Sequence, residues 1–495
     1  MVNRKNDRPN LIFILSDDQG SWAMNCSGTK ELNTPNLNRL AKEGILFDNF
    51  FCSSPVCSPA RASILTGQIP SAHGVLDFLR RGNSAHASKI AKHAEDGIEI
   101  TYMEGQTSYI QDLANAGYVC GLSGKWHLGN SRLPQLGFSY WNVHAGGDGN
   151  YYSAPMWSNF NFYEPEGYVT DVITDNAIEF LEVQKSKDVP FSLNIHYTAP
   201  HAPWNRENHP IQRFDSYFNN SSFDEMPNQK IHRDHLQKHP LASLLGDTPD
   251  NRRSALSGYF TSIEEMDRNI GRVIDWLEAN NLRDNTLIIF TSDNGMSMGH
   301  HGIWGKGNGT YPPNMFDTAI KVPTIISQPG IVPQNIVSDD LLSQYDFTPT
   351  ILEYLGLDFT LSEKMPGKSF SSLLKGESFD SSNHICVFDE YGPTRMIRTK
   401  KWKYVHRYAS GPYPSGPHEL YNLELDPGEE TNLMERPENL PQARELLTML
   451  EEWFDRFSEP ETNGKDIHVT GRGQIGKIGD SEKPFADDLV FYYKE

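Results

Sequence analysis

The stretch CSPARASILTG, which begins at Cys57, combines a nucleophile with a helix start. Pro59 suits the first turn of a helix, because its missing N–H would have no partner there. Residues 60–65 then continue as a short helix that Gly67 ends. The spacing predicts that Cys57 lies at a helix N-terminus, where free N–H groups favour negative charge, with Arg61 pointing back toward it. From this stretch alone, an anion site built on a cysteine and a buried cysteine beside a helix cap both remain open.

Four oxygen-bearing side chains follow two apolar runs, residues 11–15 and 286–290, that are typical of buried parallel strands. They are Asp17 and Asp18 after the first run and Asp293 and Asn294 after the second. Ligands gather beyond the carboxyl ends of strands in open α/β sheets, and oxygen donors suit Ca²⁺ or Mg²⁺. Each pair is also common in turns and caps, but the pairing of two strand ends favours a metal site.

Two lysines and two histidines lie in segments near other strand ends. Lys125 and His127 are two residues apart, so in an extended segment they share a face and could clamp an oxyanion. His201 is bracketed by two prolines, which fix where its imidazole points and suit proton transfer near neutral pH. Lys306 lies in a glycine-rich loop that could cradle an oxyanion. The alternatives are surface lysines and histidines bonded within turns.

The elements that would position these residues alternate between strand and helix. We expect strands at 11–15, 45–51, 118–122, 191–197, 286–290 and 321–326, and helices at 36–42, 60–65, 108–116, 170–184, 254–280 and 346–355. Residues 146–163 and 206–253 are expected to be long irregular segments. The alternation predicts an α/β fold with a large mixed, mostly parallel sheet sandwiched by helices.

A linker rich in Gly, Ser and Asp, residues 375–383, separates the alternating strands and helices from a region with a different pattern of predicted elements. Four short strands at 385–388, 396–399, 402–408 and 419–422 and a helix at 440–457 follow it. We therefore expect an N-terminal domain of residues 1–375 and a smaller α+β subdomain, residues 384–495, with an antiparallel sheet and one helix. Its last part, residues 459–495, is expected to be a flexible tail, a loop returning to the active site being the alternative.

Composition limits the classes of partner. The 495 residues carry a net charge of −20, which argues against nucleic acid and anionic membranes as partners. The five cysteines are odd in number and scattered, so no disulfide framework is expected. The sequence contains no run of eighteen apolar residues, so no membrane-spanning helix is expected. The first ten residues lack an apolar signal region, so we expect a cytoplasmic protein, or a periplasmic or secreted one if a leader has been removed. The oligomeric state stays open.

The pattern Cys-x-Pro-Ala-Arg followed by Thr-Gly resembles the signature of the type I, formylglycine-dependent sulfatases. Across residues 9–457 the other motifs occur in that family's order. They are strand-Asp-Asp, Gly-Lys-x-His-x-Gly, Ala-Pro-His-x-Pro, Ser-Asp-Asn-Gly and Trp-Gly-Lys-Gly. The chain is therefore identified as a sulfatase of the alkaline-phosphatase-like superfamily, and residues 1–375 as its catalytic domain.

The resemblance implies a role for each candidate. Cys57 would be converted by a separate maturation enzyme to formylglycine (3-oxoalanine), whose hydrate attacks sulfur and contacts the metal. That metal would be Ca²⁺, with Mg²⁺ less favoured, held by Asp17, Asp18, Asp293 and Asn294. Arg61 would steady the hydrate, and Lys125 and Lys306 would balance charge on the sulfuryl oxygens. His201 would protonate the leaving alcohol, and His127 would take a proton as sulfate is expelled.

Two departures from the family pattern point to a particular substrate pocket. Lys321 stands where many relatives have arginine, and a lysine cannot reproduce that planar fork. The segment 206–253 has no counterpart that we can place.

The resemblance implies a sulfated small molecule or oligosaccharide as substrate. Arg80, Arg81 and Arg472 are candidate contacts to a carboxylate or second sulfate, with solvent-facing arginines as the alternative. Four aromatic residues could stack on sugar rings or belong to the core, namely Trp141, Tyr151, Tyr152 and Trp157. The alternative functions are a phosphonate monoester or phosphodiester hydrolase of the same superfamily and, more remotely, a non-catalytic protein that binds sulfated glycans.

Overall fold

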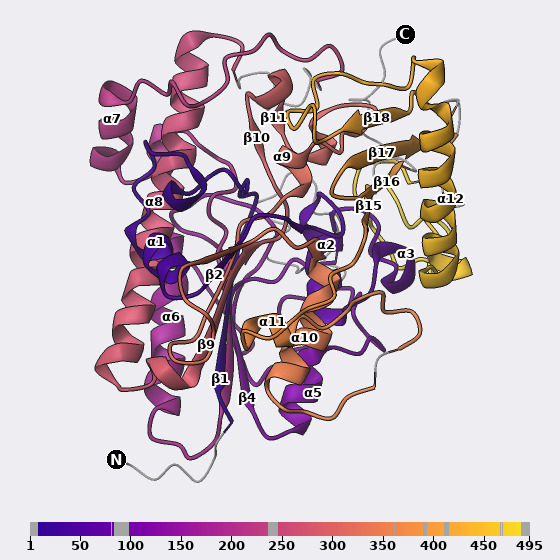
Figure 1. The fold of residues 1–495 in the computed structure, drawn as a ribbon. Coiled ribbons are helices and arrows are strands. Elements are labelled where there is room, and N and C mark those ends of the chain that lie inside the picture. Colours follow the sequence, from indigo (N-terminus) through magenta and orange to yellow (C-terminus); the bar gives the residue numbers. More distant parts are fainter. Residues whose placement is uncertain are drawn as a thin grey trace.

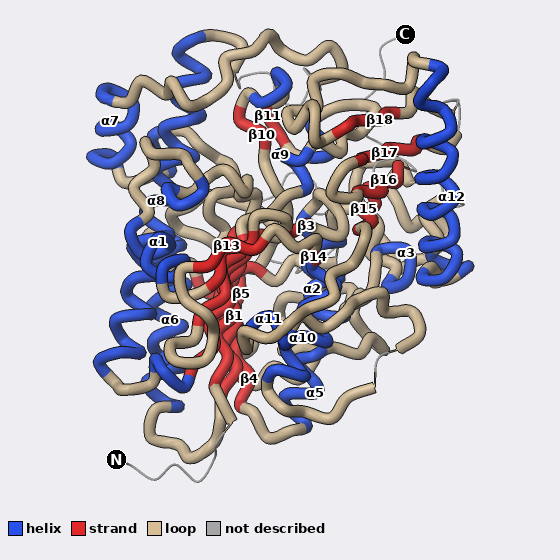
Figure 2. Tube along the Cα trace, in the orientation of Figure 1, coloured by secondary structure: helices blue, strands red, loops and turns tan. Residues whose placement is uncertain are grey.

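A mixed sheet runs through the middle of the larger part of the molecule (Figures 1 and 2). The computed structural model describes residues 8–80, 82–83, 99–235, 246–360, 362–389, 394–409, 415–465, 467 and 469–486. Within them, the order of the ten strands is β13 (Ile336–Ser338), β2 (Ile45–Phe47), β12 (Thr324–Ser327), β9 (Thr286–Ser292), β1 (Asn10–Ser16), β8 (Phe191–His196), β4 (Val119–Lys125), β5 (Tyr140–His144), β6 (Met156–Ser158) and β7 (Asn161–Tyr163). The five strands from β9 to β5 are parallel, whereas β12, β6 and β7 pair antiparallel with their neighbours.

Both faces of the central strands are covered by helices. Residues of β1 alternate between two cores: Phe13 packs on the side of α2 (Cys57–Thr66), α5 (Tyr109–Asn115) and α10 (Phe347–Tyr354). Ile12 packs on the opposite side, with α1 (Pro35–Lys42), α6 (Val169–Gln184) and α8 (Pro249–Ala279). Figure 1 shows these two helical layers on either side of the sheet. Burial on both faces explains why β1 is a continuous apolar run rather than an alternating one.

A second sheet of four antiparallel strands forms the C-terminal part. Its order is β15 (Ile385–Asp389), β16 (Thr394–Arg398), β17 (Trp402–Arg407) and β18 (Glu419–Asn422), and α12 (Leu440–Phe457) covers it. Their core also includes Ile69, Leu76 and Tyr345, so the C-terminal sheet packs on the segments around α3 (Pro70–His73) and before α10 of the N-terminal part. The expected fold class is confirmed, while the domain boundary between residues 375 and 384 stays a prediction.

Short elements complete the described chain. They are β3 (Phe50–Phe51), α3 (Pro70–His73), α7 (Ile211–Asn220), β10 (Ser297–Met298), β11 (Trp304–Gly305), α9 (Asp317–Ile320), β14 (Leu342–Ser343) and α11 (Ser371–Leu374). In the described ranges, no helix is both long and apolar enough to cross a membrane.

Two segments differ from expectation: one was predicted as a continuous strand and the other as an irregular segment. The strand expected at 45–51 is broken into β2 and β3, because Asp48 and Asn49 favour a turn over a strand. Residues 146–163 contain the hairpin β6–β7, which extends the large sheet. Its two-residue loop places Asn159 and Phe160 at positive φ, as a tight hairpin requires.

The segment expected to be irregular at 206–253 contains α7 and the first turn of α8. The start of α8 follows from ordinary helix signals: the Thr248 hydroxyl accepts the N–H of Asn251 at 3.2 Å, and Pro249 occupies the first helical position. Residues 236–245 of that segment lie outside the described part of the chain.

Candidate active site

The candidate residues meet at the carboxyl ends of β1, β9 and β4. Strands β1 and β9 are parallel neighbours in which Ser16 pairs with Ser292, so the polar residues that follow them come side by side. Lys125 is the last residue of β4, within the strand rather than beyond it, and Cys57 is the first residue of α2. Topology therefore assembles groups that are more than 200 residues apart in the chain.

Backbone hydrogen bonds and the backbone conformation hold Asp17 and Asp18 in place. Asp18 has a φ of 63°, and its N–H donates to Oδ1 of Asp293 at 3.0 Å. Its carbonyl accepts the hydroxyl of Tyr259 at 2.9 Å, and the N–H of Asp17 donates to the carbonyl of Ala199 at 3.0 Å. The two aspartates therefore diverge, which lets neighbouring residues face different partners.

Each carboxylate of the cluster faces a buried cation. Nζ of Lys125 lies 2.6 Å from Oδ2 of Asp17, and Nζ of Lys306 lies 2.6 Å from Oδ1 of Asp18. The Arg61 guanidinium binds Oδ2 of Asp293 with Nε at 3.0 Å and Nη2 at 2.9 Å, and its Nη1 donates to the carbonyl of Lys125. All of these side chains are at least nine-tenths buried, which is tolerable because each charge is paired.

The three carboxylates differ in how far the neighbouring positive charges offset the effect of burial on their pKa values. Burial raises the pKa of Asp17 to about 6 even though Lys125 opposes the shift. Burial also acts on Asp18 and Asp293, but the charges of Lys306 and of Arg61, respectively, outweigh it and lower the pKa of both carboxyls. The position of Asp17 therefore has room for additional positive charge.

Sγ of Cys57 lies buried next to the carboxylates of Asp17 and Asp18. Nζ of Lys306 donates to Sγ at 3.3 Å, and the sulfur lies at the N-terminus of α2. Burial raises the pKa of the Cys57 thiol despite Lys125 and Lys306, so the thiol stays protonated and is a poor nucleophile. Surroundings of hydrogen-bond donors suit oxygen atoms at this position better than a neutral thiol.

The donor set fits a divalent cation of the oxygen-preferring kind. One ligand atom from each of Asp17, Asp18 and Cys57 lies within 4.8 Å of the others. Oδ1 of Asp17 and Oδ1 of Asn294 are buried and accept no hydrogen bond from any described residue. Buried acceptors without donors are costly, and a cation between them would satisfy both.

The surroundings of His127 differ from those predicted. His127 does not share an extended face with Lys125, because the chain turns at His127, where φ is 55°. Its ring lies against Gly147, where a Cβ would come within 2.2 Å of Nε2, and its Nδ1 bonds no described residue. Burial, reinforced by Lys125 and Arg61, lowers the pKa of His127 well below its ordinary value, which keeps the ring neutral.

His201 is the more accessible histidine. Its Nδ1 donates to the carbonyl of Ala202 at 2.7 Å, and Nε2 lies 3.6 Å from Oδ2 of Asp18. The prolines on either side, Pro200 and Pro203, follow cis peptide bonds. The loop after β8 presents Nε2 of His201 to Asp18.

The two segments that carry Arg80 and Arg472, predicted to contact substrate, pair with each other near Cys57. Phe78 packs against Cys57, and the tail returns alongside it, with the N–H of Gln474 donating to the carbonyl of Phe78 and that of Arg80 donating to the carbonyl of Gln474. Arg472 therefore comes close to Arg80, and both are half-buried. The expectation of a flexible tail is wrong for residues 469–486, because buried Gln474 bonds both sides of this loop. Arg81 lies outside the described residues.

Three of the four aromatic residues proposed for sugar stacking belong to the core. Trp141, Tyr151 and Trp157 are each at most 5% exposed, which corrects that interpretation. Tyr152, at 36%, is exposed. The sequence had offered no way to separate the two cases, because buried and sugar-binding aromatics occur in similar loops.

Residues that sequence reasoning missed support the site from outside. Asn314 holds the loop of Lys306, Asp77 accepts the N–H of Gly473 at 3.0 Å, and Gln474 joins the tail to the loop of Phe78. None of these three residues belongs to a recognisable sequence motif, so their supporting role is visible only from their contacts in the structure.

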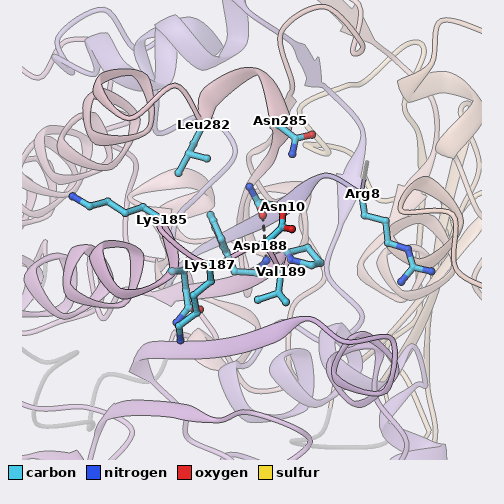
Figure 3. Close-up of a pocket in the computed structure, with 11 residues that line it drawn as sticks. Arg8, Asn10, Lys185, Lys187, Asp188, Val189, Leu282 and Asn285 are labelled. Atoms are coloured by element: carbon cyan, nitrogen blue, oxygen red, sulfur yellow. Dashed lines mark hydrogen bonds between the residues drawn. The ribbon is translucent and has the colours of Figure 1, made fainter. Parts of the chain in front are cut away.

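A surface pocket lies at the opposite end of the sheet. Figure 3 shows it lined by residues that precede β1, β8 and β9, including Arg8, Lys187 and Asn285. It therefore lies at the amino ends of the strands, away from the clustered carboxylates, and takes no part in the candidate active site.

Comparisons with known proteins agree with this geometry. Residues 9–357 match the family model for sulfatases, and residues 299–456 match that for the C-terminal part of N-sulphoglucosamine sulphohydrolase. An N-acetylglucosamine-6-O-sulfatase of Bacteroides thetaiotaomicron is 28% identical over 93% of this chain and 88% of its own. A choline-sulfatase of Rhizobium meliloti is also 28% identical, over 87% of this chain and 83% of its own.

Solved structures show the same fold. A protein in complex with its substrate D-glucosamine-2-N,6-O-disulfate is 26% identical, with a TM-score of 0.73 over 93% of this chain and 100% of that one. A phosphonate monoester hydrolase of Agrobacterium radiobacter is 20% identical, with a TM-score of 0.67 over 91% of this chain and 96% of that one, which shows a common fold alone.

Proposed function

Since the chain belongs to the sulfatase family of the alkaline-phosphatase-like superfamily and is a sulfuric ester hydrolase, we propose that it removes sulfate from a sulfated saccharide. We propose that formylglycine, made from Cys57 by a separate maturation enzyme, supplies the hydrated aldehyde whose hydroxyl attacks sulfur. The single observation that carries the proposal is the buried cluster of Asp17, Asp18 and Cys57 among three cations.

The charge balance of the site supports a cation there. Three carboxylates face three cationic side chains, so the cluster by itself is close to neutral, in a chain whose net charge is −20. An anionic sulfate ester would gain little from such a site. Ca²⁺, with Mg²⁺ as the less favoured ion, would be held by Asp17, Asp18, Asp293 and Asn294 beside residue 57, and it would polarise the sulfate oxygens.

The cationic side chains would stabilise charge where it develops. Nζ of Lys306 reaches both Asp18 and residue 57, so it can contact a sulfuryl oxygen without leaving its carboxylate. Lys125 would act from the side of Asp17, while Arg61, fixed on Asp293, would steady the oxygens of residue 57. Buried donors that need no reorganisation are the most effective kind.

The two histidines would divide the proton transfers between them. His201 is the partly exposed one, and with Nδ1 donating to a carbonyl its Nε2 faces the cluster, where the imidazolium form would give its Nε2 proton to the leaving alcohol. His127 is kept neutral by burial, so it would accept a proton from residue 57.

The substrate is proposed from the relatives and from the arginine pair. The matched proteins include a sulfatase named for N-acetylglucosamine 6-O-sulfate and a structure holding a disulfated glucosamine. Arg80 and Arg472, beside Phe78, would bind a second anionic group of such a sugar. Arginine suits sulfate or carboxylate because its planar fork donates two hydrogen bonds at once.

The test compares substrates on the chain expressed together with a maturation enzyme. We expect sulfate release from D-glucosamine-2-N,6-O-disulfate, measured by ion chromatography, and a higher kcat/KM on an aryl sulfate than on an aryl phosphodiester. A preference for the diester would identify a phosphodiester or phosphonate hydrolase instead. Binding of the disulfated sugar without any release would identify a glycan-binding protein.

A further inference from the structure

The loop of Lys306 is closed by one side chain, that of Asn314. Lys306 follows β11, and the chain returns through residues 313–317 to the start of α9. Nδ2 of Asn314 donates to the carbonyls of Lys306 at 2.9 Å and Gly307 at 3.1 Å, and the N–H of Asn314 donates to the carbonyl of Gly307 at 3.0 Å. The backbone of Lys306 is therefore placed by whatever holds Asn314.

Asn314 is held from both sides by β17 of the C-terminal sheet. Lys403 and Arg407 are four residues apart on this strand and so lie on one face. Nη2 of Arg407 donates to the carbonyl of Pro313 at 2.8 Å, and Nζ of Lys403 donates to the carbonyl of Met315 at 2.9 Å. The two cations therefore bind the residues immediately before and after Asn314.

Both cations are buried and paired with carboxylates. Lys403 is 0% exposed and pairs with Asp317, at 2.6 Å, and with Glu429. Glu429 in turn accepts the N–H of Asp317 at 2.6 Å, and Arg407 pairs with Glu419 at 2.7 Å. Desolvation offsets most of the attraction within buried pairs, so what such a network contributes is mainly a defined geometry.

Apolar contacts bind the same loop to the same sheet. Ile303, just before β11, and Phe316, just before α9, form a small buried cluster with Tyr421 and Leu423, which lie on and just after β18. Figure 1 shows α9 and the β10–β11 hairpin next to β17 and β18. Both arms of the Lys306 loop thus contact the C-terminal sheet.

We propose that the C-terminal sheet positions Lys306 for the reaction, with Lys403 and Arg407 acting as positioning residues through Asn314. The proposal rests on the proposed contact between Lys306 and the sulfuryl group. It gives the C-terminal part a role in the rate of reaction that is separate from binding the sugar.

The test is a double-mutant cycle on kcat/KM for an aryl sulfate, with the full-length, matured, calcium-loaded enzyme. Lys403→Met and Asn314→Ala should each lower kcat/KM about 10- to 100-fold, the scale expected when a catalytic group is misplaced by about 1 Å. Because both act on one loop, the double variant should be at most about twofold slower than the slower single variant. Inhibition by inorganic sulfate should weaken in both, since Lys306 would contact the product.

Arg283→Met is the matched control, because Arg283 is a buried arginine, 4% exposed, at the far end of β9. It should lower the melting temperature without a comparable loss of kcat/KM, and its effect should multiply with that of Asn314→Ala. Where Lys403→Met fails to fold, the pair Lys403→Met with Glu429→Gln removes charge and counter-charge together and takes its place.

Two results would overturn the proposal in different ways. If the losses from Lys403→Met and Asn314→Ala multiply, the sheet does not act through Asn314, and the proposed function is untouched. If Lys306→Ala keeps the wild-type kcat/KM, the proposed role of Lys306 is itself wrong, and no positioning of it matters.

Discussion

Arg61 offers a prediction whose size follows from the contacts of one side chain. The guanidinium makes two bonds of 3.0 and 2.9 Å to Asp293 and is 1% exposed. Arg61→Met would leave the Asp293 carboxylate buried without its partner, and breaking a buried pair in this way costs about 3–5 kcal/mol. For a chain of this size we expect a fall in melting temperature of roughly 3–5 °C.

The same substitution should respond to calcium. If a dication binds Asp293 together with Asp17, Asp18 and Asn294, it supplies part of the positive charge that Arg61→Met removes. Differential scanning calorimetry should therefore show a larger loss of melting temperature in EDTA than in calcium. Arg283→Met, far from the cluster, should lose the same amount in both. Equal losses for Arg61→Met in EDTA and calcium, or a cost under about 1 kcal/mol, would refute the reasoning about this cluster.

Three other expectations concern catalysis, pH and the tail. Lys306→Ala should lower kcat/KM on an aryl sulfate by about 10²–10³-fold, as the loss of an oxyanion donor does, and a loss under about tenfold would count against its role. Burial lowers the pKa of His73 to about 3. Below its ordinary pKa of 6.5 the unfolded chain binds the proton that the folded one refuses, so stability falls as pH falls. His73→Gln should remove roughly 3 kcal/mol of this acid sensitivity at pH 4 in urea melts, and an unchanged pH dependence would contradict it. Gln474→Ala leaves the N–H of Leu76 without its acceptor at 3.0 Å and loosens the loop of Phe78. It should raise KM several-fold, whereas Gln328→Ala, which empties an equally buried glutamine site bonded to Asp284 and Tyr354, should not.

The parts of the site that follow strand ends could be predicted from the sequence. Asp17 and Asp293 come after uninterrupted apolar runs, and parallel neighbours in a sheet bring such ends together whatever the intervening chain does. Cys57 and Arg61 are one helical turn apart, so their relation is local. Local spacing and strand order therefore place most of the cluster before any side-chain contact is known.

What could not be predicted depends on contacts between distant segments. Nothing in the sequence around Lys403 or Asn314 distinguishes them from a surface lysine and a turn asparagine, and only β17 passing beside residues 313–317 gives them a role. The tail around Arg472 was expected to be flexible because it is rich in glycine and polar residues. Gln474, buried and hydrogen-bonded to Gly74, 400 positions earlier in the chain, and to Leu76, overrides that local tendency.

The turn at His127 was missed for a local reason. The expected extended segment would have placed Lys125 and His127 on one face, but a positive φ at His127 turns its ring against Gly147 instead. A histidine tolerates a positive φ better than a β-branched residue does, but the sequence around His127 contains no signal that predicts this conformation.

The most direct test of the account is the mass of the peptide that contains residue 57, taken from enzyme that hydrolyses sulfate esters. Burial keeps the thiol protonated among donors that suit oxygen, so the account requires the aldehyde in the active fraction. The predicted result is a peptide whose thiol sulfur has been replaced by an aldehyde oxygen, in a proportion that follows the specific activity. A fully active preparation in which residue 57 still has the mass of cysteine would contradict the account.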